Sequence, residues 1–299
     1  MLTLTAPHDQ ARRLRSLIEG AAPAAPLPAT SRCRTVAVTS GKGGVGKSHL
    51  ALNLAVTYAQ QGAKVGLLET NFGLSSLDLL CGQNGYWNLE HVLVGARQLA
   101  DVMLEGPAGV QILTGGSSLS TVDQLPESVL QTLQRKLSAW EQSLDFLIVD
   151  TGTGASPLVR KFAAAAQQVV IVTTPEATAM TDAYATTKVL AQESSTSLVL
   201  VVNQADDEVL AKRVAERICD TSRQFLRRDL RNGAAIPLDA QVPLAVRQRQ
   251  PFVVAAPEAP ASQAIRQLAN QLETWPKPAG SAGWFQRIWT ELPGIKAVK

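Results

Sequence analysis

Short runs of β-branched and other apolar residues recur along the chain, and longer segments with helical spacing separate them. Because runs that are apolar on both faces are typical of buried parallel strands, they predict the interior of a parallel sheet. The clearest runs are "RTVAVTS" (34–40), "KVGLLET" (64–70), "VQILTGG" (110–116), "DFLIVDT" (145–151), "VVIVTT" (169–174) and "LVLVVN" (198–203). A shorter run, "AAIPL" (234–238), predicts one more strand.

The segments between these runs predict helices, because apolar residues recur there every three or four positions. They cover 47–61, 124–142, 157–167, 177–194, 207–226 and 258–273. Strands that alternate with helices in this way are typical of a doubly wound α/β fold. We therefore expect a mostly parallel, twisted sheet with helices on both faces.

Two segments rich in proline, alanine and glycine lie outside this alternating body. "GAAPAAPLPATS" (20–31) and "PKPAGSAG" (276–283) both have the composition of extended linkers. We divide the chain into an N-terminal segment with a helical pattern, 1–19, a linker, 20–33, one large domain, 34–275, and a C-terminal linker with an amphipathic helix, 276–299.

Composition narrows the class of protein. Of the 299 residues 45% are hydrophobic, which is enough for a large core, and the formal net charge of +3 gives no global field for nucleic acid. We therefore expect no nucleic acid partner. Cys33, Cys81 and Cys219 are few and scattered, which suits buried thiols in a reducing cytosol.

The sequence predicts a cytoplasmic protein that is soluble or attached only to the surface of a membrane. Its start, "MLTLTAPHDQARRLR", lacks the apolar centre of a secretion signal. No apolar run approaches the ~18 residues that a membrane span needs.

"SGKGGVGKSHLALNLA" follows the first predicted strand and opens a predicted helix, which is the context in which a glycine-rich loop binds phosphate. Its glycines permit a close approach, so that successive backbone N–H groups can surround phosphate oxygens. Lys47 adds positive charge, Ser48 offers a hydroxyl to Mg²⁺, and the helix N-terminus favours the anion. The predicted phosphate-binding residues are Gly41, Lys42, Gly43, Gly44, Val45, Gly46, Lys47, Ser48 and His49.

"DFLIVDTGTG" supplies a second candidate metal ligand. Asp150 ends a buried strand, the usual place of the carboxylate that holds Mg²⁺, and Gly152 and Gly154 can let the next loop respond to a terminal phosphate. An Asp at a strand end can also simply cap a helix. Its pairing with the glycine-rich loop favours the metal role.

"KGGVGKS" resembles the deviant Walker A motif of the MinD/ParA family, in which the first lysine reaches across a dimer interface to the partner's nucleotide. The resemblance covers roughly residues 34–272 and implies a MinD-like P-loop NTPase fold. It also implies ATP or ADP with Mg²⁺ as cofactors and a homodimer when ATP is bound. Lys42 would then couple ATP binding to dimerisation and stabilise the charge that develops in phosphoryl transfer.

Other segments resemble further parts of that family. "TTPEATAMTDAYATTKVL" (173–190) resembles the segment that borders the dimer face, which places Glu176 and Asp182 there. "LVVNQ" (200–204) resembles the strand end that reads adenine, so Asn203 takes that role and the loop from Pro237 closes over the base. A turn cap is the alternative for Asn203. His49 stands where many relatives carry a small hydroxyl residue that touches the α-phosphate.

The sequence departs from the family at the residues of hydrolysis. The family carries Asp-x-Asp after the second strand, and "LLETNFGLSSLDLLCG" (67–82) has Glu69 and Asn71 there. Asn71 cannot act as a base and can only position water through its amide. With Lys42 and Lys47 as the other candidate catalytic residues, we predict a slow ATPase unless Glu69 or a partner protein substitutes. A non-hydrolysing scaffold and a fully active enzyme are the alternatives.

"DQARRLR" (9–15) is similar to the DQAxxLR motif of the FlhG family, the MinD-like regulators of flagellar number and placement. There the segment is a helix that docks on the FlhF GTPase and stimulates it. The resemblance implies an FlhF-type GTPase as partner, and by analogy flagellar basal-body (C-ring) proteins or a flagellar transcription regulator. The predicted docking residues are Asp9, Gln10, Ala11, Leu14 and Arg15. A solvated helix without a partner is the alternative.

The final segment, "WFQRIWTELPGIKAVK", predicts an amphipathic helix. Its apolar face covers an arc of about 140° at 100° per residue and consists of Trp284, Phe285, Ile288, Trp289 and Leu292. Such a face with basic residues nearby suits membrane lipid, and MinD-type proteins carry C-terminal membrane-targeting helices. We therefore predict peripheral attachment to the inner face of the cell membrane. Packing on the domain's own surface is the alternative, and both hold if the helix switches with nucleotide state.

Two rival classes make different demands on the sequence. A ParA-like DNA-partition ATPase should have a basic DNA-binding face and no amphipathic tail. An iron–sulfur carrier of the related Mrp type should have a CxxC pair, which this sequence lacks.

Overall fold

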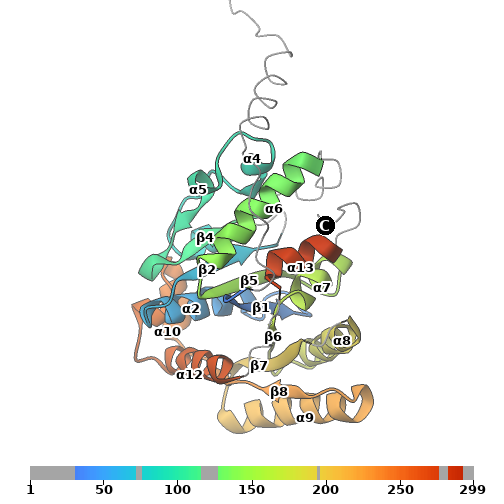
Figure 1. Ribbon diagram of the computed structural model, residues 1–299. Helices are drawn as coiled ribbons and strands as arrows, with labels where there is room; N and C mark the ends of the chain where they lie inside the picture. The colour runs from blue at the N-terminus through green and yellow to red at the C-terminus, as the bar shows by residue number, and fades with distance from the viewer. Residues whose placement is uncertain (1–30, 72–75, 116–126, 194–195, 276–281, 292–299) are drawn as a thin grey trace, which may run out of the picture.

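The apolar runs form the strands of one twisted sheet in a computed structural model that describes residues 31–71, 76–115, 127–193, 196–275 and 282–291 (Figure 1). Within this part of the chain the sheet has nine strands in the order β3-β4-β2-β5-β1-β6-β7-β8, with β9 pairing to β7. All of these pairs are parallel except β3 with β4. The strands are β1 (Arg34–Ser40), β2 (Val65–Glu69), β3 (Leu104–Glu105), β4 (Gln111–Leu113), β5 (Phe146–Thr153), β6 (Gln168–Thr173), β7 (Ser197–Ala205), β8 (Leu230–Asn232) and β9 (Ile236–Pro237).

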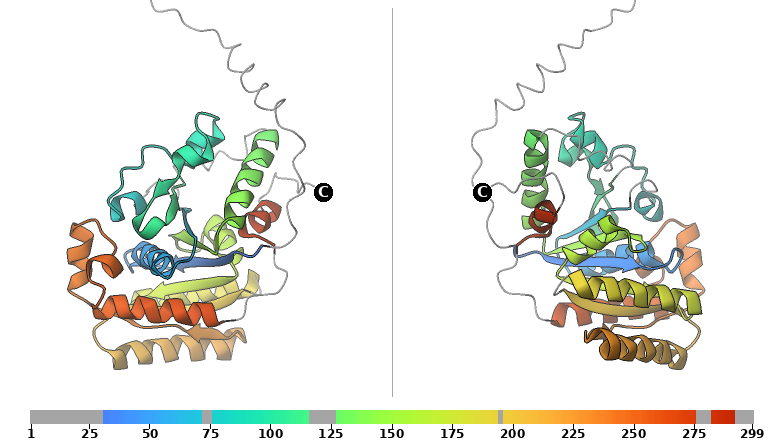
Figure 2. Two further views of the ribbon diagram at one scale, coloured as in Figure 1. Left: turned by 60° about the vertical axis from the view of Figure 1, so that its left-hand side comes forward. Right: turned by 90° about the vertical axis from the view of Figure 1, so that its right-hand side faces the viewer.

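Helices cover both faces of the sheet, as Figure 2 shows from two sides. The longer ones are α2 (Lys47–Gln60), α6 (Glu127–Gln142), α7 (Pro157–Ala164), α8 (Ala177–Glu193), α9 (Glu208–Leu226), α12 (Pro260–Thr274) and α13 (Trp284–Glu291). The shorter ones are α3 (Leu77–Leu80), α4 (Leu89–Leu93), α5 (Leu99–Val102), α10 (Gln241–Arg247) and α11 (Phe252–Ala255), with a 3-10 turn at Pro107–Gly109.

Two apolar cores lie on opposite faces of the sheet. On one face α2 packs with α12, and Leu54 and Leu268 both belong to the core there. On the other face α6, α7, α8, α9 and α13 form a second core, with Leu137 and Ile218 among its buried residues. This is the layered arrangement that the alternating sequence pattern predicted. Because the strands are parallel, their carboxyl ends lie on the same side of the domain.

The C-terminal helix α13 is packed on the domain. Trp284, Phe285, Ile288 and Trp289 are all buried in the core that α13 shares with α6 and α7. The Trp284 ring N–H donates to the carbonyl of Phe162 in α7 (3.0 Å). Of the two arrangements that the sequence allowed for this face, the structure therefore contains the internal one. Leu292 lies outside the described residues.

A buried carboxylate holds the start of α13. Glu141 of α6 is 1% exposed and accepts the backbone N–H groups of Trp284 (2.7 Å) and Phe285 (3.2 Å). These are N–H groups without a partner inside the helix, so the carboxylate caps it from another element. Burial raises the pKa of Glu141, and the two N–H groups oppose that rise. Within the described residues, no helix combines the length and apolar character of a membrane span.

Candidate nucleotide-binding site

The glycine-rich loop connects β1 to α2 and is shaped by close contacts that only glycine permits. A Cβ at Gly41 would lie 2.3 Å from the backbone oxygen of Asp182 in α8. Gly46, at the start of α2, has φ of 90°, and a Cβ there would lie 2.2 Å from the Asn203 amide nitrogen. The loop therefore packs against α8 at its front and against the end of β7 at its back.

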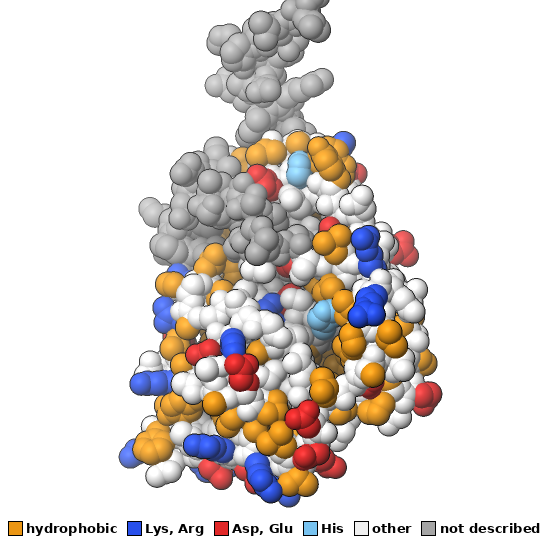
Figure 3. All heavy atoms as spheres, turned by 180° about the vertical axis from the view of Figure 1, so that it is seen from behind, with side chains coloured by type: hydrophobic (Ala, Val, Ile, Leu, Met, Phe, Trp, Pro, Cys, Tyr) orange, Lys and Arg blue, Asp and Glu red, His pale blue; other side chains and the backbone are white. Residues whose placement is uncertain are grey.

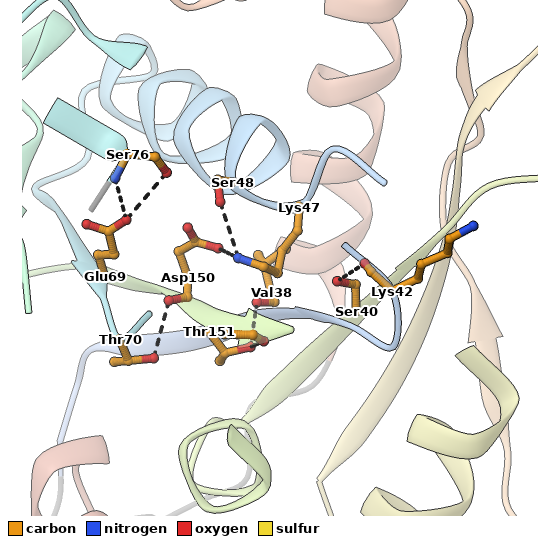
Figure 4. A network of polar contacts seen from close by, with 11 residues as sticks. Val38, Ser40, Lys42, Lys47, Ser48, Glu69, Thr70, Ser76, Asp150 and Thr151 are labelled. Atoms are coloured by element: carbon orange, nitrogen blue, oxygen red, sulfur yellow. Dashed lines mark hydrogen bonds and ion pairs between the residues drawn. The ribbon is translucent and has the colours of Figure 1, made fainter. Parts of the chain in front are cut away.

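Lys47 and Asp150 meet at the centre of the site (Figure 4). The Lys47 Nζ lies 2.5 Å from Asp150 Oδ1 and 3.2 Å from the hydroxyl of Ser48. The Lys47 side chain is 6% exposed and that of Asp150 is fully buried. Burial raises the pKa of Asp150, while the Lys47 ammonium opposes that rise.

The same carboxylate offers a ligand position for a cation. Asp150 Oδ2 is buried and has no hydrogen-bond partner within the described residues, and the hydroxyl of Ser48 lies beside it in the same network. A carboxylate oxygen and a hydroxyl are the hard oxygen donors that Mg²⁺ prefers. The residues present therefore fit a Mg²⁺ ion that accompanies a bound nucleotide.

Lys42 points away from this centre, toward the outside of the loop (Figure 4). Its Nζ lies 2.5 Å from Glu176 Oε1 and 2.8 Å from the hydroxyl of Thr178, both next to the start of α8. The Lys42 and Glu176 side chains are 34% and 58% exposed. The hydrogen bond from Lys42 lowers the pKa of Glu176. Lys42 and Glu176 are therefore neighbours at the loop surface, and the Asp182 backbone lies next to Gly41 of the same loop. Their predicted place on a dimer face stays a prediction.

The two candidate residues of hydrolysis lie in different environments. Asn71 lines the cavity in front of the loop. Glu69 is 1% exposed at the end of β2, beside Asp150, and accepts the backbone N–H of Ser76 (2.9 Å). Glu69 thus holds the start of α3, and its carboxylate is engaged with the chain rather than placed on the cavity wall.

A cavity of ≈ 810 Å³ extends from the loop. It opens on the face at the back of Figure 1, which Figure 3 shows. Its volume is in the range of small-molecule sites. Asn203 and Pro237 both line it, although the Asn203 amide donates to the carbonyl of Val45 in the loop (2.8 Å). His49 lines it too, and burial lowers the pKa of its imidazole.

Sequence reasoning missed one wall of this cavity. Val242, Val246 and Arg247 of α10 line it, with Leu80 of α3. "AQVPLAVRQ" carries Val242, Ala245 and Val246 at helical spacing, a signal that could have predicted α10. The predicted docking residues, from Asp9 to Arg15, lie outside the described residues.

Comparison with known proteins connects this geometry to a family. The family model described as ParA, NUBPL iron-transfer P-loop NTPase, matches residues 32–273. Antiactivator FleN of Pseudomonas aeruginosa is 34% identical over 254 residues, which cover 85% of this chain and 91% of FleN. Flagellum site-determining protein YlxH of Helicobacter pylori is 32% identical over 277 residues, which cover 89% of this chain and 90% of YlxH.

Solved structures share the fold at lower identity. MinD of Pyrococcus horikoshii, solved as a complex with Mg-ADP, superposes with a TM-score of 0.65 at 24% identity and covers 81% of this chain and 96% of its own. The chain matched in the MinC:MinD cell division complex of Aquifex aeolicus gives 0.64 at 22% identity, covering 84% of this chain and 100% of its own. The fold is therefore MinD-like.

Proposed function

Because this chain belongs to the ParA family of P-loop NTPases, we propose that it is an ATP-dependent, dimerising regulator of flagellar number or placement, of the FlhG type. The observation that carries the proposal is the similarity to antiactivator FleN and to flagellum site-determining YlxH along most of both chains. The test is complementation of a strain that lacks its own FlhG-type gene. We expect normal flagellar number from the wild-type chain and not from Lys47→Ala. Failure of both at equal protein levels would contradict the proposal.

The loop residues would bind ATP with Mg²⁺. The backbone from Gly41 to Ser48 would surround the phosphates, and Lys47 would exchange Asp150 for a phosphate oxygen. Ser48 and Asp150 would hold Mg²⁺, which neutralises phosphate charge when bound. Pro237 and Asn203 would border the base, with the Asn203 amide also bracing the loop through Val45.

Dimerisation would follow from the outer lysine. Lys42 lies on the loop surface and is tied there by an exposed contact to Glu176. A partner nucleotide with several negative charges can compete for this cation, whereas one exposed carboxylate holds it weakly. We therefore infer that ATP-bound chains form a homodimer through Lys42, with Glu176 and Asp182 at the same face.

Hydrolysis would be slow. Asn71 lines the cavity without a basic group, and the Glu69 carboxylate is engaged with Ser76. A general base contributes ~10²–10⁴-fold to such reactions. The Asn71→Asp variant should therefore release phosphate at least about tenfold faster than wild type, measured at saturating ATP and Mg²⁺. Asn71→Ala is the matched control, and an Asn71→Asp rate no higher than wild type would show that Asn71 is not what limits the reaction.

Membrane attachment would require α13 to leave its place on the domain. Trp284, Phe285, Ile288 and Trp289 are buried, so they cannot contact lipid and α6 at once. Flotation with anionic vesicles tests this. We expect Glu141→Gln, which weakens the cap on α13, to bind more lipid than wild type. The double variant Glu141→Gln with Trp289→Glu should bind less lipid than Glu141→Gln alone. Equal flotation of all three would contradict an α13 anchor.

The N-terminal segment would dock on an FlhF-type GTPase. The support is the sequence motif at 9–15. Co-purification of full-length protein and of a version without residues 1–20 with the cell's own FlhF-type GTPase tests it. Recovery of the GTPase by both versions alike would exclude this segment as the docking element. Basal-body proteins and a flagellar transcription regulator are further proposed partners by analogy.

A further inference from the structure

A groove runs along the outer edge of β8, the last strand of the sheet, and continues past its carboxyl end along residues 233–237. Two cavities of ≈ 710 Å³ and ≈ 350 Å³ follow one another there and share Asn232. In the part of the chain that the structure describes, β8 pairs with β7 on one side and with no strand on the other. The sheet therefore ends at β8, which Figure 1 labels beside α9.

The backbone of β8 presents hydrogen-bonding groups to the groove. Gly233 donates its N–H to the carbonyl of Leu200 in β7 (2.8 Å). Because successive backbone groups of a strand point to opposite sides, those of Asn232 and Leu230 point away from β7. An unpaired edge of this kind is a template for another extended chain.

Two helices form the walls, each through one stripe of residues. The α9 wall has side chains every three or four positions: Glu208, Lys212, Glu216, Asp220 and Arg223. The α12 wall has side chains every four positions and continues into the residue after the helix: Gln263, Gln267, Gln271 and Trp275. From Glu208 to Arg223 the wall is about 22 Å long. This length accommodates about six or seven extended residues.

The α12 wall is suited to a peptide backbone. A glutamine amide both donates and accepts, so Gln263, Gln267 and Gln271 can pair with peptide N–H and C=O groups. The Gln271 Oε1 is buried and has no hydrogen-bond partner within the described residues. Such an atom costs free energy until a donor reaches it, which a backbone N–H in the groove would supply.

The charges favour a basic ligand. Lys212 lies 3.9 Å from Glu216 and Arg223 lies 2.9 Å from Asp220, so these two cations of the α9 wall have carboxylate partners. The Arg231 guanidinium lies over the Trp275 ring at 5.0 Å. Glu208 in the larger cavity and Asp229 in the smaller one form no ion pair within the described residues. A negative charge is thus available in each cavity.

We propose that this groove binds an extended, basic segment of a partner protein, which adds to the sheet as a strand beside β8. Backbone hydrogen bonds to β8 and the glutamine stripe hold the segment, and lysine or arginine side chains pair with Glu208 and Asp229. The groove follows the lateral edge of the sheet, whereas the nucleotide site lies at the carboxyl ends of the strands, and Pro237 lines both cavities. The proposal does not depend on the proposed function.

The test selects a display library of random heptapeptides on the full-length protein. Peptides that are enriched should carry lysine or arginine and bind the wild type in a titration. Asn232→Pro removes the outward N–H and costs no sheet hydrogen bond, because proline is accepted on an open edge. It should weaken binding at least about tenfold. Asn232→Ala keeps the N–H and should bind as wild type, whereas Glu208→Lys should bind more weakly.

Other results overturn the proposal. These are the enrichment of no peptide, the enrichment of acidic peptides, and equal binding by Asn232→Pro and wild type. If a chain without residues 1–30 binds the same peptides at least about tenfold more tightly, the occupant is the chain's own N-terminal segment and not a partner. If Asn232→Pro does not fold, the test is amide hydrogen exchange of the wild-type protein, measured with and without a selected peptide. A selected peptide must then slow exchange at Leu230 and Asn232 and leave Leu104, on the opposite edge, unchanged.

Discussion

The two lysines of the phosphate-binding loop make ion pairs of the same length in very different surroundings. Lys47 and Asp150 are 6% and 0% exposed, whereas Lys42 and Glu176 are 34% and 58% exposed, and both pairs measure 2.5 Å. Buried charges need their partners, while exposed ones are satisfied by water. The length of the ion pair therefore does not distinguish the two lysines, whereas the exposure of the pair does. The inner one must always face a negative group, and the outer one can change partners.

The substitution Lys47→Ala tests the buried pair of Lys47 and Asp150, and it should have the largest effect on stability and on ATP binding. It leaves Asp150 buried and unpaired, which costs about 3–5 kcal/mol of folding free energy. ATP binding should weaken at least about 100-fold. Denaturant unfolding and calorimetric titration measure the two effects.

The loss of stability in Lys47→Ala should depend on pH. Burial raises the pKa of Asp150 in the folded chain, and this rise is larger without Lys47. The folded state then holds more protons than the unfolded state, so stability increases as pH falls. We expect a smaller loss at about pH 5 than at about pH 8. The double variant Lys47→Ala with Asp150→Ala is the control and should recover stability; a double variant as unstable as the single one would refute the buried pair as the cause.

Lys42→Ala tests the exposed lysine and should abolish the proposed ATP-bound dimer while leaving the fold intact. Lys42 touches the surface residues Glu176 and Thr178, so its loss removes no buried contact. ATP binding should stay within about threefold of wild type. Sedimentation at saturating ATP and Mg²⁺ measures the dimer. The matched control is Lys212→Ala, another exposed lysine with a glutamate partner, which should still dimerise. A dimeric Lys42→Ala protein would remove the basis for the proposed ATP switch.

Glu176→Gln sharpens the comparison and should have the smallest effect. The pair that it breaks is exposed, so the thermal midpoint should not change measurably. Thermal unfolding measures it, beside Asp150→Asn as the buried counterpart, which should unfold at a clearly lower temperature. Equal shifts in the two variants would mean that burial does not separate the two pairs.

The sequence predicted the interior of the fold better than its edges. Each long apolar run became a strand, because a strand buried on both faces must be apolar throughout. The edge strands β3 and β8 and the short helices α3 to α5 were missed. Strand β8, "LRN" (230–232), is short and polar, as edge strands often are, so it has little apolar pattern to detect.

The candidate site was predictable where motif and backbone coincide. Asp150 lies beside the loop lysine Lys47, and Lys42 lies beside Glu176, because a strand, a loop and a helix in sequence fix their relative positions. The binding and dimer-face roles of these residues stay predictions. The contact of Glu69 with Ser76, the bond from Asn203 to Val45 and the cap that Glu141 provides for α13 were not foreseen. These are tertiary contacts, and no spacing in the sequence encodes them.

The absence of a side chain at Gly41 has a mechanical consequence. With only a hydrogen there, the loop backbone presses directly against the Asp182 carbonyl, where even a methyl group would lie 2.3 Å from that oxygen. A displacement of the loop at Gly41 would therefore push directly on the backbone of α8, since no flexible side chain lies between them. A larger residue at position 41 would have to move either the loop or α8, so the two elements constrain each other's position.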